Sequence, residues 1–259
     1  MNKECVVVIP VYRPLDEVER GVVRQALLMT EGFTVRFVAG HSFVPDDTFA
    51  GFGDLDVERF DDTFFSGIPG YNRLMLSPEF YERFRDFKYV LIHQTDAYLF
   101  KPELHDWCAR GWDYIGGPWF REKKLQRYAA WQFTMRYLRL NRFKPALRQA
   151  LHNNVGNGGL SLRRVEAFLG VLEAASSGIL SVHRKDNSPI FNEDIFWGMQ
   201  APLICPGFRI PKWREAMCFA LDRSPSRLYE IMGEELPFGC HAFRKIKPEF
   251  WRKHIPLDF

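Results

Sequence analysis

Runs of consecutive apolar residues alternate along the chain with segments whose apolar positions repeat at helical spacing. The first run, Cys5 to Val11, reads CVVVIPV and is rich in β-branched residues. Such a run is typical of a strand covered on both faces, as in a parallel sheet. Pro14 and the acidic residues after it predict a helix that extends to about Thr30. Phe33 to Ala39 is the next strand, so the pattern predicts a βαβ unit.

The same alternation continues through the rest of the chain. Residues 40–70 have weak periodicity and are expected to form loops with one short strand, whereas Tyr89 to Thr95 is a second buried strand. The other expected elements are a helix starting at Ser77-Pro78, a short helix over Pro102–Arg110, short strands over Asp113–Gly117 and Leu160–Leu162, a helix over Val165–Ser176, and helices starting after Asn192 and Ser224. The pattern predicts a single α/β domain over residues 1–259, with a mostly parallel central sheet flanked by helices.

The composition is that of a folded chain with nearly balanced charge. Of the 259 residues, 46% are hydrophobic and 15% aromatic, and the formal net charge is +3. These values suit a packed core and exclude the low hydrophobicity and high charge of disordered chains. The small net charge does not indicate a nucleic-acid partner, and none is expected.

The cysteines and the apolar stretches bear on the expected location. The chain has five cysteines, at Cys5, Cys108, Cys205, Cys218 and Cys240. Their number is odd, and no two of them stand at metal-ligand spacing. They favour reduced thiols over a disulfide framework or a structural zinc site. The N-terminal residues resemble no secretory signal, and no apolar stretch approaches the roughly 20 residues that span a bilayer. We therefore expect a cytoplasmic protein.

The segment from Arg121 to His152 differs from the rest of the chain. It contains nine Lys or Arg and one acidic residue, Glu122, with aromatic residues interleaved. We expect a basic amphipathic helical insertion at 121–152. Such a segment can lie on an anionic membrane surface, or it can be a solvated helical hairpin packed on the domain. A nucleic-acid role is disfavoured because no recognised binding module accompanies the charge.

Two motifs near strand ends carry residues suited to ligand binding. Asp96 follows the buried strand directly, and ligands of open α/β sheets bind beyond the carboxyl ends of strands. A carboxylate there is costly unless it is paired or bound to a metal, although it can also cap a turn. The glycine-rich run 156–159 allows backbone to approach a ligand closely, or it is an ordinary tight turn.

Two further motifs lie in the C-terminal third. Glu193 and Asp194 stand at an expected helix N-terminus that Asn192 can cap, where carboxylates complement the helix dipole or act as a general base. Trp197 is either a core residue or a platform for a sugar ring. His241 follows a Gly-Cys turn and is either a core residue or an edge residue available to a ligand.

Seven motifs stand in order along the chain: VVVIPVYRP, GYNRLMLS, YVLIHQTDAYLF, DYIGGPW, VGNGGLSLR, NEDIFW and LPFGCHAF. Together they resemble a bacterial family of glycosyltransferase-like proteins, a domain of unknown function with the GT-A fold of nucleotide-diphospho-sugar transferases. The resemblance spans nearly the whole chain, and seven motifs in order are more specific than any one of them. It implies a single GT-A-like domain that uses a nucleotide-sugar donor.

The resemblance also implies roles for individual residues. Those implied at the donor are Pro10, Val11, Tyr12, Arg13, Asn72, Arg73, Gln94 and Asp96. Those implied at the sugar and acceptor are Trp119, Asn157, Gly158, Gly159 and Trp197. Glu193 and Asp194 resemble the acidic pair that supplies the base in inverting enzymes, whereas the context of Arg73 is similar to that of retaining enzymes. Asp96 and His241 are implied as ligands of a divalent cation, Mn²⁺ or Mg²⁺.

The chain departs from the family pattern at one position. Gln94 stands where the metal-binding motif has its first acid, so it offers an amide oxygen but no charge. The departure puts the divalent cation in question. Arg73, Arg163 or His241 can then neutralise the donor diphosphate in part or in whole.

The predicted function is transfer of a sugar to a glycan or lipid-linked glycan in cell-surface polysaccharide synthesis. The basic segment 121–152 is suited to peripheral contact with the inner face of the membrane. Two alternatives stay open. A sugar nucleotidyltransferase is disfavoured because VYRPLDEVE follows the first strand in place of a Gly-rich basic loop. A catalytically degenerate nucleotide- or glycan-binding module is favoured by the lost acid at Gln94.

Overall fold

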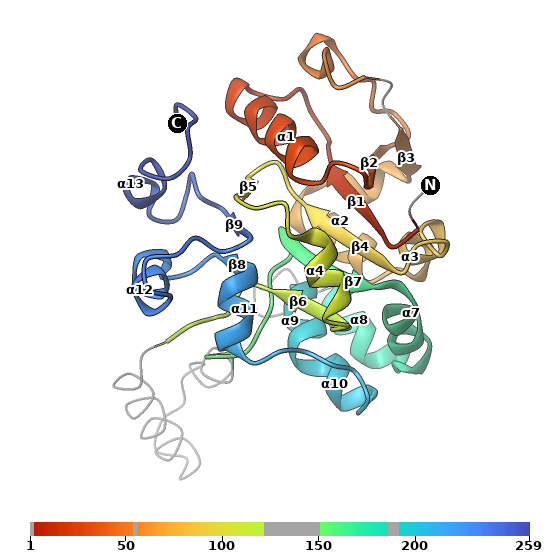
Figure 1. Ribbon diagram of the computed structural model, residues 1–259. Coiled ribbons are helices and arrows are strands. Elements are labelled where there is room, and N and C mark those ends of the chain that lie inside the picture. Colours follow the sequence, from red (N-terminus) through yellow and green to blue (C-terminus); the bar gives the residue numbers. More distant parts are fainter. Residues whose placement is uncertain (1–2, 54–55, 122–150, 186–191) are drawn as a thin grey trace, which may run out of the picture.

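The structure is a computed structural model that describes residues 3–53, 56–121, 151–185 and 192–259 (Figure 1). Its centre is a six-stranded sheet in the order β3-β2-β1-β4-β7-β6. The strands are β1 (Cys5–Pro10), β2 (Thr34–Gly40), β3 (Val57–Phe60), β4 (Tyr89–His93), β6 (Tyr114–Gly116) and β7 (Leu160–Arg164). β1 to β4 are parallel, and β7 is antiparallel to both β4 and β6. The prediction of a mostly parallel central sheet is confirmed.

A second sheet joins the C-terminal part of the chain to the end of β4. Its strands are β5 (Ala97–Leu99), β9 (Gly239–His241) and β8 (Ala220–Leu221), in that order across the sheet. β9 is antiparallel to β5, with Ala97 opposite His241, and parallel to β8. Because β5 begins just after β4 ends, this pairing brings the C-terminal third to the carboxyl end of β4.

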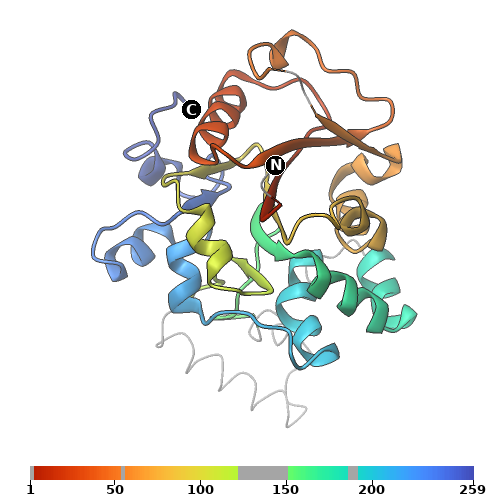
Figure 2. The ribbon, with the colours of Figure 1, turned by 45° about the vertical axis from the view of Figure 1, so that its right-hand side comes forward.

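Helices cover both faces of the six-stranded sheet, which lies between them in Figure 2. Side chains alternate along β1, so Val6 and Val8 face one core while Val7 and Ile9 face the other. The first core is closed by α2 (Gly67–Met75), α3 (Pro78–Arg83), α7 (Val165–Ala174) and the π-helical turn η4 (Phe196–Gln200). The second is closed by α1 (Glu17–Met29), α4 (Leu104–Ala109) and α11 (Trp213–Phe219). The remaining helices and turns are η1 (Asp47–Phe49), η2 (Asp62–Phe65), α8 (Ser177–Lys185), α9 (Glu193–Ile195), α10 (Ala201–Ile204), α12 (Pro225–Ile231) and α13 (Pro248–Trp251).

The structure confirms the first βαβ unit and the strand before Asp96. It also confirms the helix after Ser77, whose Oγ accepts from the Glu79 N–H at 3.2 Å and caps the helix. The sequence does not predict α2, because two glycines and a proline disfavour a helix there. Gly70 is needed in this helix because the backbone of the preceding turn packs closely against it. A Cβ at Gly70 would lie 2.6 Å from the carbonyl oxygen of Thr63.

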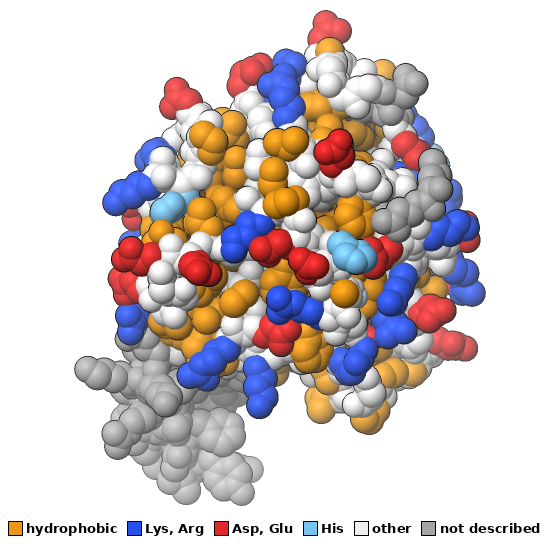
Figure 3. Space-filling model, in the orientation of Figure 1, with side chains coloured by type: hydrophobic (Ala, Val, Ile, Leu, Met, Phe, Trp, Pro, Cys, Tyr) orange, Lys and Arg blue, Asp and Glu red, His pale blue; other side chains and the backbone are white. Residues whose placement is uncertain are grey.

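The expected basic insertion falls almost wholly on residues 122–150, which lie outside the described residues, so it stays a prediction. Among the residues that are described, no helix combines the length and the apolarity needed to cross a bilayer. The face seen in Figure 3 carries acidic and basic side chains interspersed with one another, in keeping with the small net charge.

Candidate active site

The predicted ligand edge of the sheet is where β1, β4 and β6 end and the antiparallel β7 begins. The Gln94 N–H donates to the Gly159 carbonyl at 2.8 Å, which closes the β4–β7 pairing. The chain then turns, with the Ala97 N–H donating to the Gln94 carbonyl at 2.9 Å, and enters β5. Asp96 therefore stands in a tight turn between the two sheets.

Asp96 lies between two cationic side chains. Its Oδ1 is 3.2 Å from His241 Nε2, and its Oδ2 accepts from Lys245 Nζ at 3.0 Å. Burial alone would raise the pKa of Asp96, but the hydrogen bond from His241 and the charges of His241 and Lys245 hold it well below its usual range. Asp96 is therefore an anion, and the two residues implied as metal ligands lie side by side.

A second carboxylate, Asp222, faces the other side of the imidazole ring. Its Oδ2 lies 3.9 Å from His241 Nδ1. Burial alone would lower the pKa of His241, but interactions with Asp222 and Asp96 raise it to about 9. Sequence reasoning missed Asp222 and Lys245, because no local pattern marks them and only the pairing of β8 and β9 brings them to this edge.

Asp194 and Glu193 are adjacent but differ in their surroundings. Glu193 is buried and accepts from Arg163 Nη2 at 3.0 Å, in a pair that is almost fully removed from solvent. Burial raises the pKa of Asp194 to about 7, and the charges of Glu193 and Asp222 add to the effect. Asp194 Oδ1 has no hydrogen-bond partner among the described residues. One oxygen of each carboxylate lacks a partner among the described residues, but Glu193 is paired with the Arg163 guanidinium through its other oxygen, whereas Asp194 has no cationic partner of this kind.

The cap of α9 differs from the prediction. Asn192 occupies the N-cap position, but its side chain makes no capping hydrogen bond. Asn72 of α2 does this instead: its Oδ1 accepts from the Glu193 N–H at 3.2 Å, and its Nδ2 donates to Asn192 Oδ1 at 3.2 Å. Asn72, implied as a donor-binding residue, is buried and holds the start of the helix that carries Asp194.

The glycine-rich run is packed against functional side chains. Asn157 is buried, and its Oδ1 accepts from the Gly159 N–H at 2.9 Å, which fixes the turn. A Cβ at Gly158 would lie 2.7 Å from Glu193 Oε1, and one at Gly159 would overlap the ring of His241. The glycines are needed because Glu193 and His241 approach the backbone this closely.

The three arginines of the sequence predictions lie in different settings. Arg163 is fully buried and also donates to the Tyr81 hydroxyl at 3.0 Å, so the expectation that it neutralises a diphosphate is wrong. Arg73 donates to the Thr63 carbonyl at 2.9 Å. Arg13 makes two hydrogen bonds to Glu19, at 2.7 and 2.9 Å.

Glu19 is a buried residue that the sequence predictions missed as part of the site. It accepts from the Thr95 hydroxyl at 3.0 Å as well as from Arg13, and it completes the capping box of α1 with Asp16. One carboxylate thus links the end of β1 to the turn that holds Asp96.

Trp119 and Trp197, implied at the sugar and acceptor, are both buried. Trp197 is fully buried and packs against Phe168, with ring centroids 3.9 Å apart. Trp119 is 5% exposed and fills the space beside Gly156 and Gly198. Trp197 is therefore a core residue without access to a sugar, and the role implied for Trp119 stays a prediction.

A cavity of about 400 Å³ opens beyond the ends of β1 and β2. It is lined by Tyr12, Arg13, Pro14, Gly40, Ser42, Phe43, Val44, Asp62, Phe65 and Ser66. Pro10 and Val11 are buried beside this wall. Asp62 accepts from the Ser42 N–H at 3.0 Å and from its hydroxyl at 2.9 Å. Tyr12 is 63% exposed, so its ring is available to a ligand.

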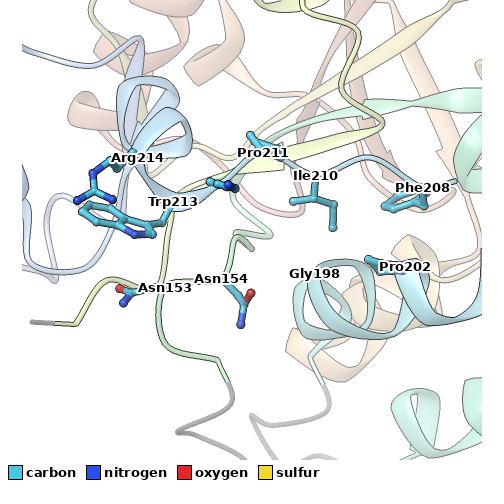
Figure 4. Close-up of a pocket in the computed structure, with 10 residues that line it drawn as sticks. Asn153, Asn154, Gly198, Pro202, Phe208, Ile210, Pro211, Trp213 and Arg214 are labelled. Atoms are coloured by element: carbon cyan, nitrogen blue, oxygen red, sulfur yellow. The ribbon is translucent and has the colours of Figure 1, made fainter. Parts of the chain in front are cut away.

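A second cavity, of about 390 Å³, lies beside the helical segment that begins at Glu193 (Figure 4). Phe208 and Trp213 contribute aromatic surface, and Asn153 and Asn154 contribute amides. Gly198, four residues after Asp194, also lines it.

The residues implied as metal ligands do not fit a divalent cation. Mg²⁺ and Mn²⁺ favour sets of anionic and carbonyl oxygens. Here both oxygens of Asp96 already bond cationic nitrogens, and Gln94 is neutral. In the parts of the chain that the structure describes, no group of three or more His, Cys, Asp and Glu side chains is arranged to hold a metal ion.

The architecture is similar to solved glycosyltransferases. Mouse xyloside xylosyltransferase 1 in its apo form has 12% identity and a TM-score of 0.52, over 92% of this chain and 97% of that chain. A glycosyltransferase involved in the glycosylation of the major capsid of PBCV-1 has 9% identity and a TM-score of 0.49, over 98% and 100% of the two chains. An active-site mutant of LgtC has 12% identity and a TM-score of 0.48, over 91% and 86%. The similarity to the xylosyltransferase shows a GT-A-like glycosyltransferase fold.

The family follows from the sequence itself. The chain belongs to the family described as "Protein of unknown function (DUF5672)", whose model matches residues 54–241. No curated protein matches the sequence.

Proposed function

We propose that this chain is a glycosyltransferase that moves a sugar from a nucleotide-sugar donor to a hydroxyl group of a glycan or lipid-linked glycan. Asp194 carries the proposal. It is a carboxylate with a pKa near 7 and an oxygen without a hydrogen-bond partner in the described chain, and it stands near the ligand edge of a glycosyltransferase-like fold.

Asp194 is the proposed general base. The acceptor oxygen bonds to the anomeric carbon while the bond from that carbon to the phosphate oxygen breaks, and Asp194 takes the acceptor proton. A base is most effective when its pKa lies near the working pH. A base that acts directly on the acceptor supports inversion of the anomeric configuration.

The donor nucleotide is assigned to the cavity beyond β1 and β2. Its volume of about 400 Å³ lies within the range of small-ligand sites. The exposed ring of Tyr12 suits stacking on a base. Asp62 suits a hydrogen bond from a ribose hydroxyl, because a carboxylate accepts on both oxygens. Arg13 lines the same cavity and is held by Glu19.

The acceptor is assigned to the second cavity, beside Gly198 and Trp213. Aromatic surface next to amides is suited to sugar rings and their hydroxyls, and the short distance along the chain from Asp194 to Gly198 supports this placement. The basic segment 121–152 supports a lipid-linked acceptor, cell-surface polysaccharide synthesis and peripheral contact with the membrane.

The test is a transfer assay across a panel of nucleotide sugars with the Asp194→Asn variant. We expect kcat/KM to fall about 100-fold or more, because the base is lost, while nucleoside diphosphate binding stays within about twofold. In the unmodified protein, kcat/KM should rise about tenfold per pH unit below pH 7 and then level off, because only the ionised base accepts a proton.

Asp86→Asn, which changes an exposed aspartate paired with Lys3, is the matched control and should leave transfer unchanged. Undiminished transfer by Asp194→Asn would contradict the role of Asp194. Tight nucleotide binding with no turnover on any acceptor would favour a binding module instead.

A further inference from the structure

The carboxylate of Asp96 is held between two cationic side chains, those of His241 and Lys245. His241 Nε2 is 3.2 Å from Oδ1, and Lys245 Nζ is 3.0 Å from Oδ2. The Asp96 and His241 side chains are 21% and 18% exposed, whereas that of Lys245 is 76% exposed. Lys245 therefore approaches Asp96 from the solvent side, where a ligand would arrive.

Gln94 adds no negative charge to this group. Its N–H donates to the Gly159 carbonyl at 2.8 Å, and its side chain is an uncharged amide. The turn therefore presents one carboxylate and one amide, which is one negative charge fewer than the two acids of the implied metal-binding motif.

We propose that this site binds the donor diphosphate without a divalent metal ion, and that the ammonium group of Lys245 supplies the positive charge while Asp96 positions it. The proposal rests on the proposed function and departs from the metal site that the sequence resemblance implies.

The ammonium group has the capacity for this role. It has three N–H donors, and Asp96 occupies one, so two remain for phosphate oxygens. Hydrogen bonds from an ammonium to phosphate oxygens are strong because both partners are charged.

The nucleotide cavity is connected to this point by a short chain of contacts. Arg13 lines the cavity and bonds Glu19, and Glu19 accepts from Thr95, the neighbour of Asp96. Arg244, the neighbour of Lys245 in the sequence, forms an ion pair with Asp16, the N-cap residue of α1. The distance from its Nη1 to Asp16 Oδ2 is 2.6 Å. Both flanks of the Asp96–Lys245 pair are thus anchored to the same helix end.

The test is calorimetric titration of the full chain with UDP, GDP, CDP and ADP, in EDTA and in Mn²⁺. We expect at least one of them to bind in EDTA, with a Kd that Mn²⁺ changes by less than about threefold. Lys245→Gln should weaken that binding about 10- to 100-fold, which is the range for a charge-assisted hydrogen bond. Lys245→Arg should retain most of the affinity, since it keeps the charge.

Lys88→Gln is the matched control. It removes the same charge from an exposed lysine at the opposite end of β4, and it should leave the Kd unchanged. Binding that disappears in EDTA and returns with Mn²⁺, or unchanged binding by Lys245→Gln, would overturn the inference and leave the proposed function standing. Failure of all four diphosphates under both conditions would overturn the proposed function as well.

Discussion

At the level of single residues, the raised pKa of Asp194 links stability to the proposed chemistry. The ordinary pKa of 3.8 applies in the unfolded chain, and the folded chain raises it to about 7. At a pH between these two pKa values, Asp194 is protonated in the folded chain and ionised in the unfolded chain. The free energy of unfolding therefore falls as the pH rises from about 4 to 7, while the proposed base becomes active over the same upper range.

This predicts a stability gain for Asp194→Asn. The variant removes the buried charge, so its free energy of unfolding should exceed that of the unmodified protein by up to about 4 kcal/mol at pH 8 and by little near pH 4. Denaturant titrations at the two pH values measure the difference. Asp86→Asn, at an exposed position, should change stability by less than about 0.5 kcal/mol at both. A gain for Asp194→Asn that does not depend on pH would contradict the raised pKa.

At the level of elements, short segments from distant parts of the chain hold one another in place. Asn72 of α2 caps α9, and Arg163 of β7 pairs with Glu193 at the start of the same helix. α9 is only three residues long and continues into η4, so its own hydrogen bonds cannot fix its direction. The position of Asp194 therefore depends on α2 and β7.

Asn72→Ala tests this dependence. It removes one buried and one partly buried hydrogen bond and should lower the free energy of unfolding by about 1–3 kcal/mol. It should also lower kcat for transfer while leaving nucleoside diphosphate affinity unchanged, because α9 loses its cap but the nucleotide cavity is intact.

The control for this prediction is Ser77→Ala, which removes the cap of α3. We expect a loss of about 1 kcal/mol in stability and no change in kcat, since α3 does not carry a site residue. An equal loss of kcat in both variants would mean that stability alone accounts for the effect.

At the level of the whole molecule, the segment 121–152 concentrates basic charge on a chain of small net charge. If it contacts a membrane, the protein should float with vesicles of anionic lipid but not with vesicles of neutral lipid. Changing Arg136, Arg139 and Arg142 to Glu should abolish flotation and leave nucleoside diphosphate binding intact. Equal flotation of the variant would contradict the membrane interpretation.

The sequence by itself determined the first βαβ unit, the buried strand before Asp96 and the place of Asp96 at its end. Continuous β-branched runs mark buried strands, and a strand that ends in a carboxylate marks the ligand edge. These signals are local, so they can be read without the fold. The same local signals left Trp197 and His241 open between core and site.

Only the tertiary structure decided which groups act together at that edge. Lys245 and Asp222 meet Asp96 and His241 because β9 pairs with both β5 and β8, and the pairing of β9 with β5 joins segments more than a hundred residues apart. The fold also buries Trp197 and Arg163 and leaves Asp194 with a free oxygen. Burial and pairing across the chain set charge and access, and neither is a property of neighbouring residues in the sequence.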